Sequence, residues 1–596
     1  MDLQQKLTRT FFISFTLLMG FGAHYFQHNQ GGSGLELAVN NVVWIFFSLL
    51  IGLGLWKISA QQKIIYSKYT AIIFIALGLF FVPVFYPNNV LADQSYTRLL
   101  GLFAGILLFL SLQQFNFTRQ QVEKILLLVV LAGLIQACYS LMQDYLLSAD
   151  NYFGYNVGYG RPYGIFQQPN VLASFMATTL ILSGYLLQKV DNKKLHIFLL
   201  LTAMLNIWVI TVAMSRTGYL GTAIALVLIA PWAWQTNKKR LGLFLLAILL
   251  GTGFASMKGD ALGARNVSSL AEGGQRLVHY SNSWDMIKEK PLLGYGYGSF
   301  EKEYLIHTAE KVKNGQSKPE SSVLTHPHND LLFWAIEGGV APILGILLLV
   351  FTFILLLCSF KLSKALALLA LVVPIAVHTQ TEYPLYHSAL HWLVLIVLVF
   401  YVDYESETTH QKRFTPTFFL RVTGTLIPLF TAIFMVTNLF TIAKITAFER
   451  SQNPDIRILM HIVNPLVFDT NFTFHLYNFR LNGAIQSGNK AEIKQIINEL
   501  ETTVYRSPKP FYFHILYLAY KHSEQPEKAL QTLQYARFLY PKDKGLKNAD
   551  AVQKSASSPV STALTTHSPK VDVSSNDLSI NKMASDSINS ENEVSQ

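Results

Sequence analysis

Two histidines stand where an imidazole could take a proton from a substrate hydroxyl. His326 and His328 flank Pro327 directly before an apolar run, and Asn329 and Asp330 follow them. Histidine suits this task because its ordinary pKa lies near neutrality. A single histidine at the end of a membrane span is more often a plain polar anchor, but a pair beside an amide and a carboxyl group favours catalysis. The residue types do not separate the two imidazoles, so both are candidate bases.

Arginine offers the second kind of chemistry, the binding of an anion. Arg216 lies in SRTG (215–218) between two apolar runs that leave almost no loop to solvate it. Such a guanidinium costs free energy unless an anion or a water-filled cavity compensates. Its planar, paired donors match the oxygens of a diphosphate. The structural alternative is an ion pair with Glu382 or Glu337.

Further candidate ligands lie in polar clusters at the ends of apolar runs. These clusters are RPYGIFQQPN (161–170), SRTG, a long loop that ends in HPHNDLLFWAIEGG (326–339), and EYPLYH (382–387). Arg161 and Arg276 could complete an anion clamp, although a solvated arginine is ordinary in a long polar loop. The candidate binding residues are Arg161, Gln168, Arg216, Arg276, Asn329, Glu337, Glu382 and Tyr383.

The composition of the chain places these clusters in a membrane protein. Of 596 residues, 51% are hydrophobic and only 14% are charged, and the mean hydropathy is +0.31. An ordinary soluble enzyme of this size is less apolar. The net charge of +11 comes from short loops between apolar runs, which explains it by membrane topology rather than nucleic-acid binding. Cys138 and Cys358 both lie in apolar runs, so no disulfide framework or zinc site is indicated.

Apolar runs long enough to cross a bilayer predict an all-α polytopic fold with about 12–14 transmembrane helices. The predicted spans are 9–27, 42–58, 69–86, 98–113, 124–147, 170–188, 195–214, 217–235, 241–257, 330–358, 363–379, 388–403 and 418–440.

Loop charge predicts the orientation of these spans. With a cytoplasmic N-terminus, the inside loops carry most of the Lys and Arg residues, whereas the short outside segments carry only Arg98, Arg161 and Arg216. All four polar clusters then fall on the outer face. Because loop charge was assigned without reference to these clusters, their shared side favours a single site.

The predicted organisation has five parts. They are an N-terminal transmembrane bundle (1–256), a large outer loop (257–330), C-terminal transmembrane helices (331–440), an outer helical region (441–551) and a disordered tail (552–596). Apolar residues at helical spacing around Ala529, Tyr535 and Pro541 resemble one tetratricopeptide (TPR) helix pair. The Ser- and Asn-rich tail has almost no aromatic residues, as disordered segments do.

Several common reaction types have no motif in the chain. GxxxxGK[ST], HExxH, paired CxxC and GxSxG are all absent from the sequence, so nucleotide hydrolysis, zinc proteolysis and serine hydrolysis are not indicated. No motif requires a metal or a cofactor. The energy for a reaction must therefore come from the substrate itself.

The four clusters together resemble a known superfamily. HPHNDLLFWAIEGG, with an H-N-x-x-L run followed by E-x-G, resembles the signature of the O-antigen ligases and polymerases. RPYGIFQQPN, SRTG and EYPLYH look more like its protein-targeting branch, the PglL-type O-oligosaccharyltransferases. The resemblance implies a GT-C type membrane fold with a periplasmic cavity for an undecaprenyl-diphosphate glycan. It places catalysis on His328, with His326 as the alternative, and diphosphate contacts on Arg216, Arg161 and Arg276.

The expected function follows from this resemblance. A preassembled glycan would pass from undecaprenyl diphosphate to Ser or Thr of a periplasmic or pilin-like protein, at the bacterial inner membrane. The expected partners are the lipid-linked oligosaccharide, the acceptor protein and the bilayer, without nucleic acid. The close alternatives are an O-antigen ligase that acts on lipid A core and an O-antigen polymerase. The alternative from another class is a transporter of lipid-linked glycans, which would place helix-breaking polar residues at mid-membrane depth.

Overall fold

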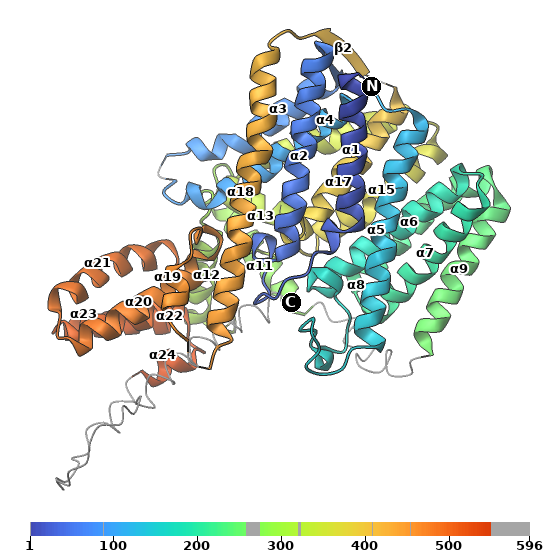
Figure 1. Ribbon diagram of the computed structural model, residues 1–596. Coiled ribbons are helices and arrows are strands. Elements are labelled where there is room, and N and C mark those ends of the chain that lie inside the picture. Colours follow the sequence, from blue (N-terminus) through green and yellow to red (C-terminus); the bar gives the residue numbers. More distant parts are fainter. Residues whose placement is uncertain are drawn as a thin grey trace.

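The computed structural model describes residues 2–87, 89–257, 274–319, 324–407, 409–452 and 454–549, and its long elements are all helices (Figure 1). Within these ranges, eleven helices are long and apolar enough to cross a membrane. The predicted all-α, polytopic membrane fold is confirmed. The predicted disordered tail, 552–596, and residues 258–273 of the predicted outer loop lie outside the described residues.

The helices up to the large outer loop are α1 (Leu3–Gly20), α2 (Ala38–Gln61), α3 (Thr70–Phe81), α4 (Tyr96–Gln113), α5 (Arg119–Tyr145), α6 (Pro169–Lys189), α7 (Lys193–Val212), α8 (Arg216–Thr236) and α9 (Lys238–Ser256). The helices of the loop and the second membrane part are α11 (Gly274–Glu289), α12 (Phe300–Lys313), α13 (Asp330–Gly338), α14 (Val340–Leu357), α15 (Leu362–Thr379), α16 (Pro384–His387), α17 (Ala389–Ser406) and α18 (Thr417–Glu449).

The C-terminal helices are α19 (Arg457–Met460), α20 (Asp469–Gln486), α21 (Lys490–Arg506), α22 (Pro510–His522), α23 (Pro526–Leu539) and α24 (Lys544–Asn548). Short 3-10 helices are η1 (Gly22–His24), η2 (Gly34–Glu36), η3 (Val82–Phe85), η4 (Ala92–Ser95), η5 (Val157–Tyr159), η6 (Gly164–Phe166) and η8 (Leu466–Phe468), and two strands are β1 (Lys63–Ser67) and β2 (Thr409–Arg413).

All thirteen predicted spans fall on helices, and two of them differ from a full span. α1 starts with polar turns, and α3 has only 12 residues before it tightens into η3. Neither is among the eleven helices that meet the length and hydropathy of a membrane crossing. At a rise of 1.5 Å per residue, α3 covers only about 18 Å, which is shorter than the hydrocarbon core of a bilayer.

The predicted span 330–358 is interrupted at Gly339. Gly339 has φ of 63°, and a Cβ atom there would lie 2.2 Å from the carbonyl oxygen of Leu292. Only glycine fits such a close approach at positive φ. The backbone N–H of Val340 donates to the same Leu292 carbonyl over 3.1 Å. The loop segment PLLGYGYGSF therefore packs against the break and separates α13 from α14.

The helix α6 forms the centre of the membrane part. Of its membrane window, 94% is buried inside the protein, and it packs against α5, α7, α8 and α15. Gln168 caps its N-terminus by accepting a hydrogen bond from the N–H of Val171 over 2.7 Å, and Pro169 occupies the first turn. The polar start of α6 is thereby held inside the bundle.

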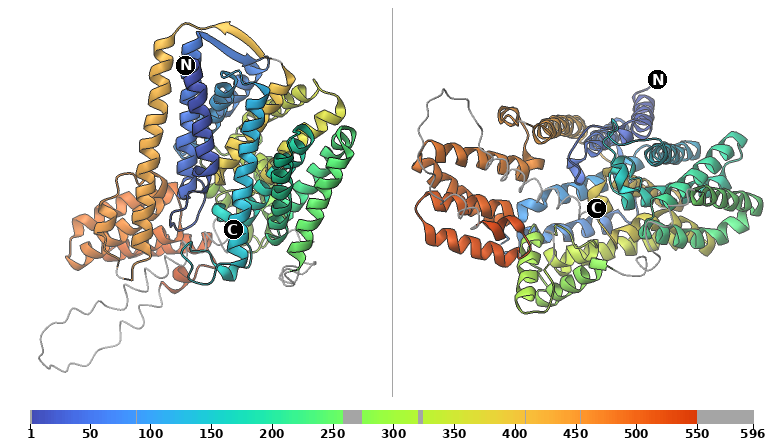
Figure 2. Two further views of the ribbon diagram at one scale, coloured as in Figure 1. Left: turned by 45° about the vertical axis from the view of Figure 1, so that its right-hand side comes forward. Right: turned by 90° about the horizontal axis from the view of Figure 1, so that it is seen from below.

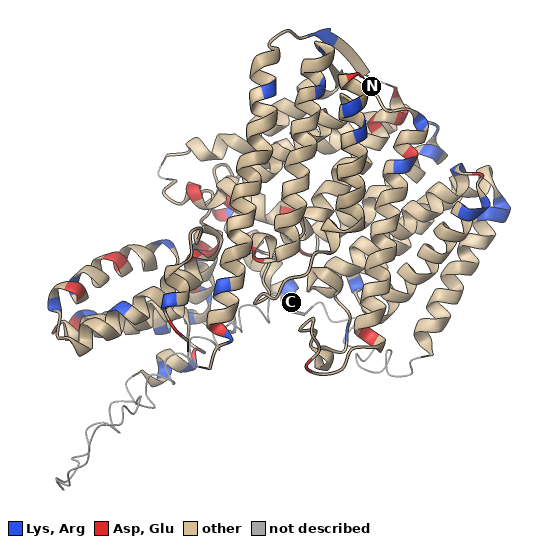
Figure 3. Cartoon of the chain, viewed as in Figure 1, with Lys and Arg blue, Asp and Glu red and all other residues tan. Residues whose placement is uncertain are grey.

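The two ends of the bundle differ in charge and in structure. At one end β1 and β2 pair antiparallel, from Lys63 opposite Arg413 to Ser67 opposite Thr409. Lys and Arg residues gather at that end and at the turn between α8 and α9 (Figure 3). The C-terminal helices lie at the opposite end, to one side of the bundle (Figure 2). α18, about 50 Å long, runs from the basic end to the C-terminal helices (Figure 1).

The C-terminal helices share a hydrophobic core with α12, which lies in the predicted loop 257–330. α20 to α23 pack against one another in succession, and the predicted TPR-like character of this region stays a prediction. Leu305 and Ala309 of α12 belong to the same buried cluster as Leu500, Phe511 and other residues of α20–α24. Lys509 also forms an ion pair with Glu301 at the start of α12, over 3.0 Å. The loop and the C-terminal region are thus one packing unit.

Candidate functional site

The turn that follows α15 is organised around the buried carboxylate of Glu382. Its Oε2 accepts hydrogen bonds from Gln168 Nε2 over 2.9 Å and from His378 Nε2 over 3.1 Å. Its Oε1 accepts from Asn170 Nδ2 over 2.6 Å and from the guanidinium of Arg276, which forms an ion pair with it. Two donors on each oxygen use the full acceptor capacity of a carboxylate.

This arrangement keeps Glu382 charged. Burial by itself raises the pKa of Glu382, but the hydrogen bond from His378 and the charges of His378 and Arg276 outweigh it and lower the pKa to about 2. An ionised, fully hydrogen-bonded carboxylate has no capacity left to take a substrate proton. The geometry therefore suits Glu382 to holding Arg276 in place, with the guanidinium side chain still one-third exposed.

A buried polar chain continues from this carboxylate into the bundle. His378 Nδ1 lies 2.8 Å from the hydroxyl of Ser174, and the same hydroxyl lies 3.0 Å from His391 Nε2. All three side chains are essentially inaccessible to solvent. The chain ties α15 to α6 and α17, and it orients the His378 imidazole so that Nε2 faces Glu382.

The neighbouring Gln380 connects the turn to the outer loop. Its carbonyl oxygen accepts a hydrogen bond from Asn329 Nδ2 over 3.0 Å. The hydroxyl of Tyr280, on α11, lies 3.0 Å from the same oxygen and 3.1 Å from the carbonyl oxygen of His328. Asn329 also caps α13, since its Oδ1 accepts from the N–H of Leu332 over 3.0 Å.

The SRTG segment joins the turn on another side. The hydroxyls of Thr217 and Thr381 lie 2.9 Å apart. Arg216 is the first residue of α8, and the Ser215 hydroxyl caps that helix by accepting from the N–H of Gly218 over 3.1 Å. Arg161 reaches the residues just before SRTG, because its Nε donates to the carbonyl oxygen of Ala213 over 2.7 Å. All four polar motifs are therefore in contact around residues 380–382.

Three helix N-termini converge at this place. Gln168 before α6 bonds to Glu382, Thr217 in the first turn of α8 contacts Thr381, and Asn329 before α13 bonds to Gln380. Each helix N-terminus carries the positive end of the helix dipole, equivalent to about half an elementary charge, together with unpaired N–H groups. With Arg216 and Arg276 beside them, the arrangement favours an anion.

The two candidate histidines face different surroundings. His328 has φ of 57°, and its ring lies 6.1 Å from that of His279 and 5.6 Å from that of Tyr383. Burial lowers the pKa of His328 to about 4, and the nearby charge of Glu382 opposes that shift. Its Nδ1 is a buried atom without a hydrogen-bond partner among the described residues. A neutral imidazole with an open nitrogen is suited to accept a proton.

His326 supports its neighbour and faces a second cluster. Its Nδ1 accepts a hydrogen bond from the backbone N–H of His328 over 3.0 Å, and its Nε2 lies 3.2 Å from Asp330 Oδ1. Burial lowers the pKa of His326 and raises that of Asp330. Tyr383 lies between the histidines, with its ring 4.7 Å from that of His326.

Glu337 is not at the Glu382 cluster. Its Oε2 forms an ion pair of 2.5 Å with Arg98, and its Oε1 accepts from the N–H of Phe300 at the start of α12. The Arg98 guanidinium lies over the rings of Phe333 and Trp334, at 4.5 and 4.3 Å. The structure thus places Glu337 in a buried structural contact between α4, α12 and α13, rather than beside Arg216.

His378 and Tyr280 belong to the Glu382 cluster and were absent from the predicted set, as was Arg98, the partner of Glu337. Arg98 had a sequence signal, since it is one of few arginines on the predicted outer face. His378 also had one, because it is a lone histidine at the end of an apolar run. Tyr280 had none. In the described part of the chain, no group of three His, Cys, Asp or Glu side chains is arranged as metal ligands.

Comparison with known families covers three of these motifs in full and RPYGIFQQPN from residue 162 onwards. The model of the O-antigen ligases matches residues 201–347, which include SRTG and HPHN. A model described as protein glycosylation ligase matches 162–187, and one described as virulence factor membrane-bound polymerase, C-terminal, matches 366–555. The chain is also 24% identical over 420 residues to a general O-oligosaccharyltransferase of Acinetobacter baylyi, which covers 66% of this chain and 70% of that protein.

The chain is therefore similar to the O-antigen ligases and to their PglL-type, protein-glycosylating branch. The resemblance of the four sequence motifs is thereby confirmed. The glycosylation ligase match covers the start of α6, where Gln168 and Asn170 hold Glu382. The polymerase match runs through EYPLYH and on through the C-terminal helices. The matched segments thus include the same residues that meet at the turn after α15.

Proposed function

We propose that the chain transfers a preassembled glycan from undecaprenyl diphosphate to a Ser or Thr hydroxyl of an exported protein such as a pilin. The coarser predictions, an oligosaccharyltransferase enzyme and glycan transfer to protein, are confirmed by the glycosylation ligase match and the O-oligosaccharyltransferase relative. The donor lipid and the acceptor are the parts that we add. The site geometry supports the donor, because it is built for an anion.

The observation that carries the donor assignment is the convergence of three helix N-termini on residues 380–382. The starts of α6, α8 and α13 bring partial positive charge and backbone donors to one place. Arg276 is fixed there by Glu382, and Arg216 opens α8. A diphosphate carries the negative charge that such a site stabilises, and it is itself a good leaving group, so that transfer of the sugar needs no ATP.

The reaction that this geometry supports is a direct displacement. The acceptor hydroxyl gives its proton to the neutral imidazole of His328 as its oxygen forms a bond to the anomeric carbon. The bond from that carbon to the diphosphate oxygen breaks, and its electron pair leaves with the diphosphate. Arg216 and Arg276 neutralise the charge that grows on the leaving group. Attack opposite the departing oxygen inverts the anomeric configuration.

The contacts of the other predicted residues support positioning roles for them. His326 and Asn329 hold the backbone around His328, through the bonds to its N–H and to Gln380. Gln168 and Glu382 fix Arg276, and Tyr383 packs against both imidazoles. Holding the reacting groups in place supplies a large part of the rate of such a transfer. Arg161 supports the backbone before Arg216 through the carbonyl of Ala213.

Transfer at the periplasmic face of the bacterial inner membrane belongs to the same proposal. The chain is a multi-pass membrane protein. Its basic loops and its C-terminal helices lie at opposite ends of the bundle, which fits a cytoplasmic basic end and a periplasmic site (Figure 3). A cysteine-labelling map of single-cysteine variants tests this orientation. Labels at the α8–α9 turn and at the C-terminal helices must react from opposite sides of intact cells.

The direct test is reconstituted transfer. The purified full-length protein is supplied with an undecaprenyl-diphosphate glycan and a pilin acceptor, and glycan on the pilin is measured by intact mass. Wild type is expected to glycosylate Ser or Thr, and a folded His328→Asn variant is expected to lose that transfer. If the variant transfers at the wild-type rate, the assigned base is wrong. If wild type forms no glycoprotein but extends or ligates glycan lipids, the acceptor is wrong.

A second candidate function comes from the other two family matches. The O-antigen ligase and membrane-bound polymerase descriptions favour transfer to lipid A core or to a growing glycan. The donor chemistry would be the same, and only the acceptor differs. Mass spectrometry of proteins and lipopolysaccharide from cells with and without the gene separates these outcomes. A transporter without transferase activity would leave both classes of molecule unmodified.

A further inference from the structure

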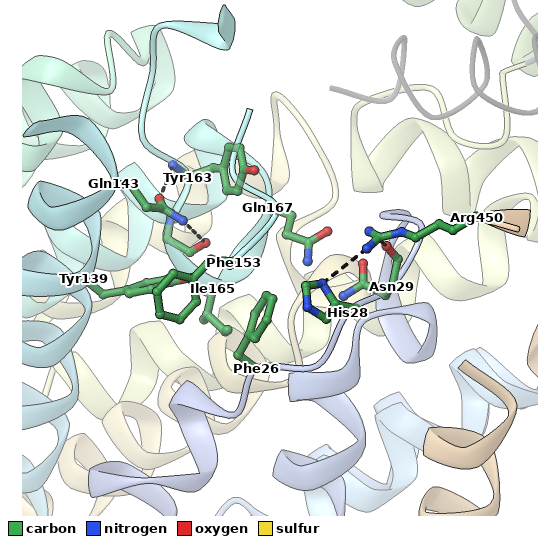
Figure 4. Close-up of a pocket in the computed structure, with 12 residues that line it drawn as sticks. Phe26, His28, Asn29, Tyr139, Gln143, Phe153, Tyr163, Ile165, Gln167 and Arg450 are labelled. Atoms are coloured by element: carbon green, nitrogen blue, oxygen red, sulfur yellow. Dashed lines mark hydrogen bonds between the residues drawn. The ribbon is translucent and has the colours of Figure 1, made fainter. Parts of the chain in front are cut away.

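A pocket lies beside the segment that leads into α6, outside the contacts described above (Figure 4). It is formed by the segment after α1, the loop before α6, the end of α5 and the end of α18. About 400 Å³ of space lies between its lining atoms, part of it open to solvent. None of the residues with an assigned role in the proposed transfer lines this pocket.

One wall of the pocket is aromatic. The rings of Phe26 and Phe153 lie 5.3 Å apart, and that of Tyr139 lies 5.5 Å from Phe153. All three side chains are half-buried. They come from three separate segments of the chain, so their packing holds the wall in shape. Figure 4 shows them together on one side of the pocket.

The opposite wall is polar. Arg450, at the end of α18, reaches the segment after α1, with its Nη1 3.3 Å from His28 Nδ1 and its Nη2 donating to the carbonyl oxygen of Asn29 over 3.2 Å. The side-chain amide of Gln167 points toward these residues (Figure 4). An amide offers two donors and an acceptor in one plane. The pocket thus sets hydrogen-bonding groups across from apolar ring faces.

Gln167 joins this pocket to the proposed transfer site. The next residue, Gln168, donates to Glu382, whereas Gln167 lines the pocket. Gln167 has φ of 57°, a left-handed conformation that non-glycine residues adopt at a cost in free energy. That conformation turns successive side chains in different directions. The pocket and the anion site therefore lie one residue apart on the chain, about 3.8 Å between Cα atoms.

We infer that the pocket is a glycan subsite, which binds a sugar residue of the donor beyond the one attached to the diphosphate. This inference rests on the proposed function. Aromatic faces fit the apolar C–H faces of a pyranose, while amide and guanidinium groups fit its hydroxyls. A site that offers both kinds of surface suits a sugar ring, and the open side of this pocket leaves room for the rest of the glycan. Its position next to the anion site is where a donor that carries several sugars would extend.

Donors of two lengths test the subsite. The full-length protein is assayed with a lipid diphosphate that carries one sugar and with one that carries an oligosaccharide. Gln167→Gly keeps the positive φ and removes the amide, and Phe153→Leu removes a ring but stays apolar. Each is expected to raise the KM for the oligosaccharide donor about tenfold, as the loss of one good contact does, and to leave the KM for the single-sugar donor unchanged.

Matched controls are Gln316→Gly, in an exposed turn after α12, and Phe85→Leu, in exposed η3. Neither is expected to change either KM. The subsite inference is wrong if Gln167→Gly and Phe153→Leu raise the KM equally for both donors. It is also wrong if they leave the KM for the oligosaccharide donor unchanged.

Binding without catalysis separates this inference from the proposed function. The probe is the free oligosaccharide released from a lipid-linked donor, without lipid or diphosphate, and its binding to the full chain is measured by saturation-transfer NMR. Wild type and His328→Asn are expected to bind it, and Gln167→Gly is expected to lose it. Binding that persists in a wild type with no transferase activity refutes the proposed function but supports the pocket.

Two results of the same measurement overturn the inference. The first is that wild type shows no saturation transfer to the free oligosaccharide. The second uses an acceptor peptide as the probe in the same NMR experiment. If Gln167→Gly keeps glycan binding but loses peptide binding, the pocket is a peptide site instead.

Discussion

Arg276 and Glu382 form an ion pair across 106 residues of sequence, between α11 of the outer loop and the turn after α15. The carboxylate is buried and has three further donors, from Gln168, Asn170 and His378, whereas the guanidinium is partly exposed. The pair therefore has one fixed member and one member that faces outward. Because of this asymmetry, Glu382 is suited to hold the Arg276 guanidinium in place, and Arg276 is suited to bind an anion.

The Glu382→Gln variant tests that division. Without the negative charge, Arg276 loses its fixed position, and donor kcat/KM is expected to fall about tenfold or more because a buried ion pair is broken from one side. The measurement is transfer from an undecaprenyl-diphosphate glycan at varied donor concentration. The matched control is Glu405→Gln, which breaks ion pairs with Lys189 and Lys364 at the basic end of the bundle. If both variants lose activity alike, the effect is general destabilisation.

Substitutions of the two histidines are expected to lower kcat by very different amounts. His328→Asn tolerates the positive φ at that position and removes the base, so kcat should fall by about two to four orders of magnitude. His326→Asn only weakens the hold on the His328 backbone and should cost much less. Donor KM should stay near the wild-type value in His328→Asn. A large loss in His326→Asn together with an active His328→Asn would exchange the two roles.

The pH profile follows from the low pKa of His328. Burial lowers that pKa from 6.5 to about 4, so the imidazole is neutral, and able to accept a proton, at every pH above the shifted value. Activity that needs the neutral form is present above it and is lost as the pH falls through it. We expect kcat/KM to stay flat from pH 8 down to about one unit above that pKa. An acid limb centred at 6.5 would mean that His328 is solvated in the free enzyme.

Arg216 is expected to require the guanidinium shape and not only its charge. Arg216→Lys keeps the charge but loses the paired planar donors, so donor KM should rise about tenfold in this variant and further in Arg216→Ala. Inorganic pyrophosphate, as an inhibitor, reports the same interaction without the glycan. Its inhibition constant should rise in parallel with the donor KM. If Arg216→Lys keeps the wild-type donor KM and the wild-type inhibition constant for pyrophosphate, Arg216 acts through its positive charge alone.

The Arg98–Glu337 pair is expected to matter for stability. Both side chains are largely buried, so Arg98→Ala leaves a carboxylate without its partner, at a cost of about 3–5 kcal/mol in the free energy of unfolding. The control is Arg119→Ala, which removes an exposed pair with Glu123 and should cost less than about 1 kcal/mol. Thermal unfolding in detergent compares the two. Equal midpoints would show that the Arg98 pair carries no net stability.

Sequence reasoning reached the membrane class and the helix positions because both depend on local composition. A run of apolar residues must be helical in a bilayer wherever its neighbours pack, and all thirteen predicted spans are on helices. The interruption at Gly339 was missed. It depends on the approach of the Leu292 carbonyl, which belongs to a segment nearly fifty residues earlier in the chain.

The sequence also revealed the polar motifs. It further predicted that these motifs share one end of the bundle. HPHN, SRTG, RPYGIFQQPN and EYPLYH carry polar groups where a membrane protein avoids them, and loop charge placed them on one side. What the residue types left open was the pairing. Arg216 had two carboxylates as possible partners, and the two histidines were equivalent.

Tertiary structure alone decided those pairings. Glu382 holds Arg276, Glu337 holds Arg98 from 239 residues away, and His328 rather than His326 faces the Glu382 cluster. An ion pair forms between groups that are close in space, and hydropathy and helical period describe only neighbours along the chain. The sequence by itself therefore determined where the protein meets the membrane and which side chains are available for chemistry. Only the packing of α6, α8, α13 and α15 determined which of those side chains meet.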